Sequence, residues 1–432
     1  MSAVLRPWKG WRVASGECRV ENNTAQRIAH GAWRVSLLSS VLCSLIAGLT
    51  GCAPQQPKAP QDKPLLAYQN ELLDLAFETA TMIPIVPHIK DRSKAQAAAV
   101  SLCFELDQPQ RALRYIEKIG DWRRGAGYAD YAFYCAQLGF TNDVQHYLNL
   151  AEQISLIADQ DWRRDRIKVR IAQTHLLLGQ TGHAEHFSSN LEKSEAGKAE
   201  QVGAMVCAED EFDARMAELD ALLAIGDFDL TKNALNTCVQ FYDRFYDNVL
   251  RRTAVEEKVK ASWTKIPYNI RIELLSDMAG FSLKHTDAAN ALRLVNEAKA
   301  LMDSVTWPVE YHIPIMARLA GLRFRCGETN AARAELLAAL DLFDGKQSAI
   351  INIDKAETLV SVAEAFQTVE DSAKALAVYK QAVEAAVENP NNRPRAEDIS
   401  AICLSMAKRS VEPDAALWAR IREIKGALGE PW

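Results

Sequence analysis

The chain has 432 residues, of which 48% are hydrophobic and 25% are charged, a composition that suits a globular protein with a substantial core. With a formal net charge of −6 for the whole chain and +4 for residues 1–51, the remainder carries −10. Such an acidic body excludes binding that rests on neutralising nucleic-acid phosphates, and it disfavours adsorption to anionic membranes by charge.

The first recognisable element is an apolar run from Val35 to Ala47, about thirteen residues long, which follows a cationic segment ending at Arg34. The run is shorter than the roughly 20 apolar residues that span a bilayer, and it is typical of the core of a secretory signal peptide. The alternatives are that residues 35–51 form a buried helix or an uncleaved membrane anchor.

The residues that follow, Leu49-Thr50-Gly51-Cys52, resemble the lipobox of bacterial lipoproteins. The resemblance implies that the sulfur of Cys52 is acylated, that residues 1–51 are removed as a signal peptide, and that the new amino terminus is acylated too. Two or more acyl chains hold a protein firmly on a membrane, whereas one holds it only marginally. Residues 52–64, rich in Pro and Gln, then form an extended tether. Because Ala53 rather than Asp follows the cysteine, the resemblance implies the outer membrane, facing the periplasm.

From Leu65 onward, apolar residues recur at spacings of three and four, which predicts an all-α fold without strands. The helices repeat: the motif DWRR occurs at Asp121–Arg124 and again at Asp161–Arg164, 40 residues apart. Around these motifs lie pairs of predicted helices joined by a Gly or acidic turn. Such repetition favours a solenoid over a globular bundle.

The pairs resemble tetratricopeptide repeats. In that family, small residues let two helix backbones approach and aromatic residues fill the gap to the next pair. One unit matches the pattern well, with Leu359, Val362, Ala363, Phe366, Ala375 and Tyr379. The resemblance implies a right-handed α-solenoid of tetratricopeptide-like helix pairs, about seven to eight units long.

The spacing of the units departs from the regular 34 residues of the family. The second-helix anchors are separated by 32, 40, 47, 60, 41, 43 and 41 residues, and they are Ala112, Val144, Ala184, Thr231, Ala291, Ala332, Ala375 and Ala416. The longest step contains Pro267, which disfavours a continuous helix there. We therefore predict two arrays, residues 65–248 and 265–432. We also expect Pro314 to fall just before a first helix.

Six cysteines follow Cys52, widely spaced and without a C-x-x-C pair: Cys103, Cys135, Cys207, Cys238, Cys326 and Cys403. The predicted compartment is oxidising, which permits disulfides. We interpret these residues as buried free thiols that act as small hydrophobic side chains. The alternative is a disulfide between neighbouring units, for which Cys103 and Cys135 are the best pair.

The sequence carries no strong motif for catalysis or metal binding. His183 and His186 would share a helix face near His175, but no second pair of ligands accompanies them. The motifs of serine hydrolases, P-loop proteins and zinc proteases are absent from the sequence. We therefore expect neither catalysis nor a metal or cofactor.

Two sets of side chains are candidates for a partner surface. Arg123, Arg124, Arg163 and Arg164 would form a basic strip for an acidic partner, while Trp122 and Trp162 pack between units. The second set, Phe241, Tyr242, Phe245 and Tyr246, would line the concave surface and hold a peptide. For these aromatic residues, packing between units is the competing interpretation.

Together these features predict a lipid-anchored scaffold or adaptor of the cell envelope that binds other proteins. One alternative is an envelope enzyme, or a regulator of one, related to peptidoglycan and built on a helical superhelix. Another is a self-assembling structural component of the envelope. The sequence does not identify the partner.

Overall fold

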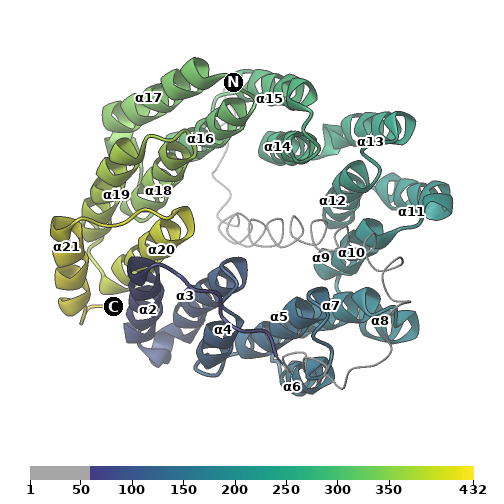
Figure 1. Ribbon diagram of the computed structural model, residues 1–432, viewed down its shortest axis with the longest axis horizontal. Helices are drawn as coiled ribbons and strands as arrows, with labels where there is room; N and C mark the ends of the chain where they lie inside the picture. The colour runs from purple at the N-terminus through teal and green to yellow at the C-terminus, as the bar shows by residue number, and fades with distance from the viewer. Residues whose placement is uncertain (1–58) are drawn as a thin grey trace, which may run out of the picture.

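The computed structural model describes residues 59–432, and every regular element in that range is a helix (Figure 1). The predicted all-α class is therefore confirmed for the described residues. The predicted signal peptide, Cys52 and most of the tether lie outside the described residues.

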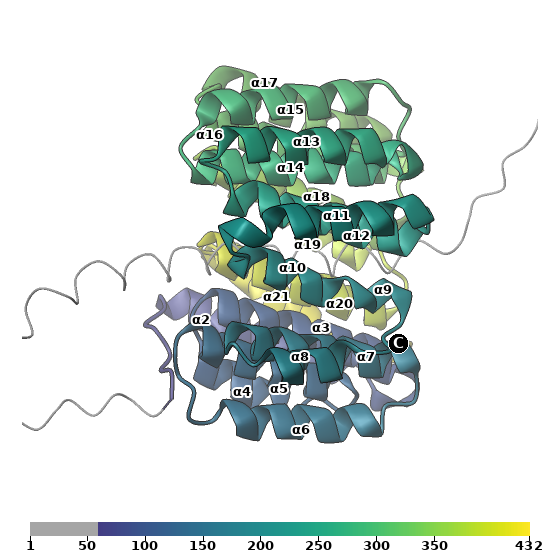
Figure 2. The same cartoon turned by 90° about the vertical axis from the view of Figure 1, so that its right-hand side faces the viewer.

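The helices form a ring that has an inner and an outer layer (Figures 1 and 2). The inner layer contains α3 (Ile85–Glu105), α5 (Arg123–Gln137), α7 (Asp161–Leu177), α9 (Lys193–Ala196), α10 (Lys198–Val206), α12 (Phe228–Arg244), α14 (Tyr268–Lys284), α16 (Val309–Arg325), α18 (Asn352–Thr368) and α20 (Asn392–Arg409). The outer layer contains α4 (Pro109–Ile116), α6 (Val144–Leu156), α8 (Thr181–Ser188), α11 (Phe212–Ile225), α13 (Val249–Ser262), α15 (Ala288–Asp303), α17 (Thr329–Lys346), α19 (Ser372–Val387) and α21 (Ala415–Gly426). An additional helix, α2 (Ala67–Met82), precedes them.

Neighbouring inner helices are joined by ion pairs whose partners are 40 or 41 residues apart. Asp130 of α5 pairs with Arg170 of α7, Asp243 of α12 with Lys284 of α14, and Asp277 of α14 with Arg318 of α16, each at 2.6 Å. Each pair joins similar positions on two successive inner helices, so these helices run parallel. The outer helices return the chain in the opposite direction.

The turns explain why the chain reverses after each helix. Several turns use a residue in the left-handed region, which glycine adopts without the steric cost that a Cβ brings. Gly139, Gly179 and Gly327 do this between an inner and an outer helix, with φ of 79°, 71° and 95°. Outer helices are also capped: the Asp287 carboxylate accepts from the main-chain N–H of Asn290 at 2.9 Å.

The ring closes because α2 packs beside α20, so the two ends of the described chain meet (Figure 1). One apolar cluster contains side chains from both ends, among them Leu72, Phe77, Ile399 and Ile421. The contact of α2 with α20 and α21 is called the seam below. The ring has no chain connection across the seam.

The predicted break between residues 248 and 265 is wrong. These residues form α13 and a short 3-10 helix, Trp263–Lys265, and α13 joins its outer-layer neighbour α15 through Glu256–Arg293 and Lys260–Glu297 ion pairs. A single apolar cluster runs through this region from Ala204 to Leu322. Pro267 sits before α14, at its N-cap. Residues 249–264 are therefore not a linker between two arrays.

Two assignments of helix order are also wrong. Thr231, predicted on a second helix, lies on the inner helix α12, and the predicted first helix before it is the outer helix α11. The turn between them contains Gly226 with φ of 74°, the same conformation as the inner-to-outer turns. Pro314 lies inside α16, which begins five residues earlier at Val309.

Part of the predicted tether belongs to the folded surface. The Lys63 N–H donates to the Asp107 carbonyl at 2.9 Å, and the Asp62 carboxylate accepts from the Gln110 N–H at 2.7 Å. Pro60 is buried, and its carbonyl accepts from the Gln110 side chain at 2.9 Å. Residues 60–64 are thus held on the turn before α4 and on its first residues.

Candidate functional site

The DWRR motifs pack against each other, as predicted for their tryptophans. The rings of Trp122 and Trp162 meet edge to face with centroids 5.3 Å apart. Arg123 and Arg163 lie over these rings, at 4.8 and 5.2 Å from the centroids. The repeated motif therefore marks a packing contact between α5 and α7.

The predicted basic strip does not form at these arginines. Arg123 is only 7% exposed and pairs with Asp121 at 2.7 Å. Arg163 pairs with Asp159 at 2.8 Å, and Arg164 pairs with two further carboxylates, those of Asp161 and Asp165, at 2.9 and 3.1 Å. Arg124 is exposed. Because acids neutralise three of the four charges, these residues present no continuous basic surface.

The aromatic set at the end of α12 and in the turn that follows it is buried. Phe241, Tyr242, Phe245 and Tyr246 are at most 4% exposed, so packing between units is the correct interpretation. The Tyr242 hydroxyl accepts from the Asn290 side chain at 2.6 Å, and the Tyr246 hydroxyl donates to Asp287 at 2.9 Å. These side chains join α12 to α14 and α15 and are not available to a partner.

The cysteines of the described chain are free thiols, as the first interpretation predicted. All except the half-buried Cys326 are buried, and Cys103 and Cys135 form no disulfide. Burial raises the pKa of the Cys135 thiol to about 12, and it raises the pKa of Cys103 further. Neither thiol is therefore poised to react as a thiolate.

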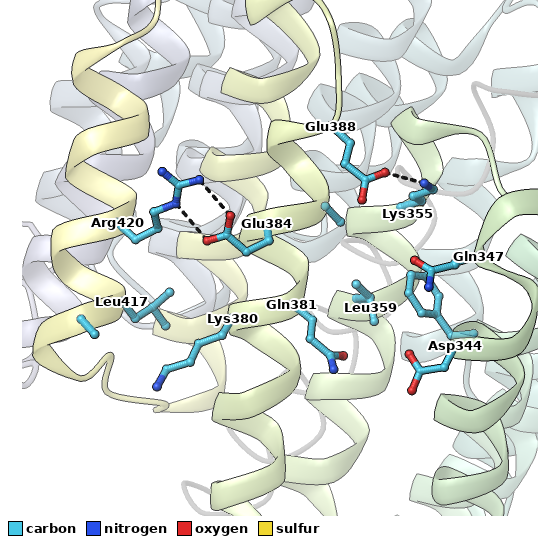
Figure 3. Close-up of a pocket in the computed structure, with 13 residues that line it drawn as sticks. Asp344, Gln347, Lys355, Leu359, Lys380, Gln381, Glu384, Glu388, Leu417 and Arg420 are labelled. Carbon is cyan, nitrogen blue, oxygen red and sulfur yellow. Dashed lines mark hydrogen bonds and ion pairs between the residues drawn. The ribbon is translucent and has the colours of Figure 1, made fainter.

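A groove of about 640 Å³ opens on the outer side of the ring, between α17, α19 and α21 (Figure 3). This volume lies within the range of about 300–1,000 Å³ that is usual for ligand pockets. No pattern in the sequence predicted this groove. It is lined by Phe343, Asp344, Gln347, Lys355, Leu359, Lys380, Gln381, Glu384, Ala385, Glu388, Ala416, Leu417 and Arg420.

The floor of the groove is apolar. Phe343 of α17, Leu359 of α18, Ala385 of α19 and Leu417 of α21 are between 1% and 6% exposed. Leu359 is the floor residue that comes from the inner layer, on α18. An apolar side chain placed on this floor would be removed from water, which favours binding by about 25 cal/mol per Å² buried.

The walls are charged, and their cations are already paired. Arg420 donates to both oxygens of Glu384, at 2.9 and 2.8 Å, while Lys355 pairs with Glu388 at 2.5 Å (Figure 3). Lys380 pairs with Asp414 at 2.5 Å. These pairs tie α19 to α18 and α21 and fix the shape of the groove.

The ion pairs also set the charge of the walls. The hydrogen bonds from Arg420 hold the pKa of Glu384 below its usual value. Hydrogen bonds from Lys380 and from the N–H of Leu417 do the same for the pKa of Asp414. Both carboxylates are therefore charged at neutral pH.

Three polar side chains of the lining are exposed and form no ion pair or hydrogen bond within residues 59–432: Asp344, Gln347 and Gln381. Figure 3 shows Gln381 on one side of Leu359, with Gln347 and Asp344 on the other. The side-chain amides can pair with a peptide backbone, and the carboxylate can accept from a cation. The lining contains no His, Cys, Ser or Tyr.

Comparisons of the sequence with protein-family models and with curated proteins found no match. Among residues 59–432, no helix combines the length and the apolarity that crossing a bilayer requires. In the same range, no set of three or more His, Cys, Asp or Glu side chains is arranged to hold a metal ion.

Proposed function

We propose that the protein is a lipid-anchored scaffold of the bacterial cell envelope that holds a segment of another protein in the groove between α17, α19 and α21. The observation that carries the proposal is the groove itself, with an apolar floor and unpaired polar groups along its walls. This combination is typical of sites that recognise a peptide by one anchor side chain and its backbone.

The charges of the groove favour a particular kind of segment. Every cation in the lining has an anionic partner, whereas Asp344 has no cationic one in the described part of the chain. A bound segment gains most if it carries an apolar residue for the floor near Leu359 and a basic residue for Asp344. The side chains of Gln347 and Gln381 would pair with its main chain.

The rest of the proposal concerns architecture and location. The helix pairs belong to a right-handed, tetratricopeptide-like solenoid. The spacing of 40–41 residues between the ion-paired inner helices supports a repeated unit. The chain is attached to the outer membrane, on its periplasmic side, through acyl groups on Cys52. The lipobox-like Leu49–Cys52 supports this attachment. The protein itself is not an enzyme.

Site-specific photo-crosslinking tests the groove. A benzophenone amino acid replaces Gln381 in the groove and, as a matched control, Gln145, an exposed glutamine on the remote outer helix α6. The proposal expects a discrete adduct from position 381, mapping to one segment with an apolar and a basic residue, and none at position 145. Adding Asp344→Lys should reduce the yield several-fold. Equal adducts from both positions would contradict the proposal.

Metabolic labelling tests the anchor. Labelled palmitate should be incorporated into the wild-type protein and not into Cys52→Ser, which should also keep its signal peptide. Continued labelling and normal processing of the Cys52→Ser protein would refute the attachment.

A further inference from the structure

The helix α21 lies between the groove and the seam, with one face toward each. Leu417 and Arg420 contribute to the groove, and Arg422 and Lys425 form ion pairs across the seam with Glu71 and Glu78 of α2. One short helix therefore depends on the closure of the ring on one side and shapes the candidate binding site on the other.

The seam is specific rather than a general apolar contact. The Gln69 side chain donates to the Ala407 carbonyl at 2.9 Å, and the Ser400 hydroxyl donates to the Ala76 carbonyl at 3.0 Å. Both donor residues are buried, at 6% and 1% exposure. These two bonds set the register between α2 and α20, and the ion pairs then fix α21 against α2.

The groove side of α21 is held by polar contacts to α19. Asp414 caps the helix by accepting from the Leu417 N–H at 2.9 Å, and the same residue pairs with Lys380 at 2.5 Å. Arg420 adds its bidentate contact to Glu384. If the ion pairs across the seam were lost, α21 would keep these contacts to α19 but would lose its ion pairs to α2 on the opposite face.

We propose that closure of the seam controls the groove, so that binding of a protein segment and docking of α2 on α20 and α21 favour each other. This inference rests on the groove being the binding site proposed above. The coupling is reciprocal, because a segment that prefers the closed groove must stabilise the closed ring by the same factor. In the sequence, α2 directly follows the segment that leads to Cys52. Under this proposal, a change in how α2 docks therefore links the anchored end of the chain to the binding site.

The width of the groove can be measured without a ligand. Nitroxide labels are attached at Gln347→Cys and Ala416→Cys, two exposed positions on opposite walls, in the mature chain carrying Cys52→Ser and Cys326→Ser. Double electron–electron resonance then gives the distribution of distances between the labels. Amide hydrogen exchange of α2 reports separately whether the seam is open.

Reversing the charges on the α2 side of the seam should open it, and reversing their partners on α21 as well should close it again. Glu71→Lys with Glu78→Lys should raise amide exchange in α2 and α21 roughly tenfold and broaden the distance distribution. Adding Arg422→Glu and Lys425→Glu should restore both readouts. A control with Glu218→Lys and Asp303→Lys makes the same change in net charge at exposed ion pairs remote from the seam, and it should alter neither.

A steric variant, Ser400→Trp, parts α2 from α20 if charge reversal is too weak. An open seam with an unchanged distance distribution would overturn the proposal, and so would a seam that neither variant opens. The failure of the proposed function is distinct: the labels would then respond to the seam, but crosslinking from position 381 would yield no discrete adduct.

Discussion

A glycine on α5 provides a direct test of how tightly neighbouring units pack. A Cβ added at Gly125 would lie 2.8 Å from Cγ2 and 2.9 Å from Cβ of Ile154, and 2.9 Å from Cδ1 of Ile167. The Ile154 Cβ is fixed to the main chain and cannot rotate away. Overpacking of this kind costs about 1–3 kcal/mol, and we take the upper end because the neighbour is rigid. Alanine regains about 1 kcal/mol of helix propensity, so Gly125→Ala should lose about 2 kcal/mol.

Gly280 is the matched control, a buried glycine on the inner helix α14. An added Cβ there meets no heavy atom within 4 Å, so Gly280→Ala should gain about 0.5–1 kcal/mol from propensity alone. Urea denaturation followed by circular dichroism measures both variants. Because stacked units can unfold in steps, amide exchange of α5–α7 should accompany it. Equal or greater stability of Gly125→Ala would refute the packing described for α5, α6 and α7.

Three further predictions follow from single contacts. Burial alone would raise the pKa of Glu364, but the Arg409 guanidinium and its hydrogen bonds hold this pKa below its usual value. The ion pair therefore stabilises the fold fully above about pH 4.5, and this stabilisation is lost as the pH falls through the lowered pKa. Arg409→Leu should thus cost about 1–3 kcal/mol at pH 7 and progressively less toward pH 3 in urea titrations; a pH-independent cost would contradict this. The Cys103 and Cys135 thiols should react with Ellman's reagent at pH 8 only after unfolding, so rapid reaction in buffer would contradict their burial. Gly226→Ala should lower the midpoint of thermal unfolding by the equivalent of about 1 kcal/mol, because its φ of 74° strains any residue with a Cβ; an unchanged midpoint would argue against that turn.

Local features of the fold could be predicted from the sequence because they depend on contacts within one helix or between successive units. The 3.6-residue periodicity of apolar residues indicated helices throughout residues 65–432. The DWRR motif indicated a repeated contact, which the meeting of Trp122 and Trp162 bears out. The roles of its arginines were missed, since an arginine that lies over a tryptophan and pairs with a nearby aspartate has the same sequence pattern as an exposed one.

The sequence prediction assigned helices to the wrong layers near Gly226: it took α11 as an inner helix and α12 as an outer one. A left-handed glycine between two amphipathic helices indicates that the chain reverses there, but not whether it passes from the inner to the outer layer or the other way. Either α11 or α12 could therefore be taken as the inner helix. The same error produced the apparent 60-residue step and the predicted break. With α12 taken as an outer helix, no inner helix was left to pair with α13, so α13 was taken as part of a linker. A clue lay in the Val255 and Val259 pair on α13, both fully buried and spaced as an apolar helix face.

The closed ring and the groove could not be predicted because both depend on contacts between distant parts of the chain. The bond from Gln69 to Ala407 joins residues 338 positions apart, and no local pattern specifies such a partner. The groove needs α17, α18, α19 and α21 together. Its floor residues, such as Leu359, are indistinguishable in the sequence from ordinary core positions.

The most direct test of the central claim is binding of the segment that crosslinks from position 381. A synthetic peptide of that segment, labelled with a fluorophore, is titrated with the mature chain carrying Cys52→Ser, and fluorescence anisotropy gives the dissociation constant. We predict saturable 1:1 binding that weakens at least tenfold when Asp344→Lys reverses the exposed charge of the groove, with the helical content of the variant unchanged. Binding of equal strength to a folded Asp344→Lys variant would show that the groove does not hold the partner.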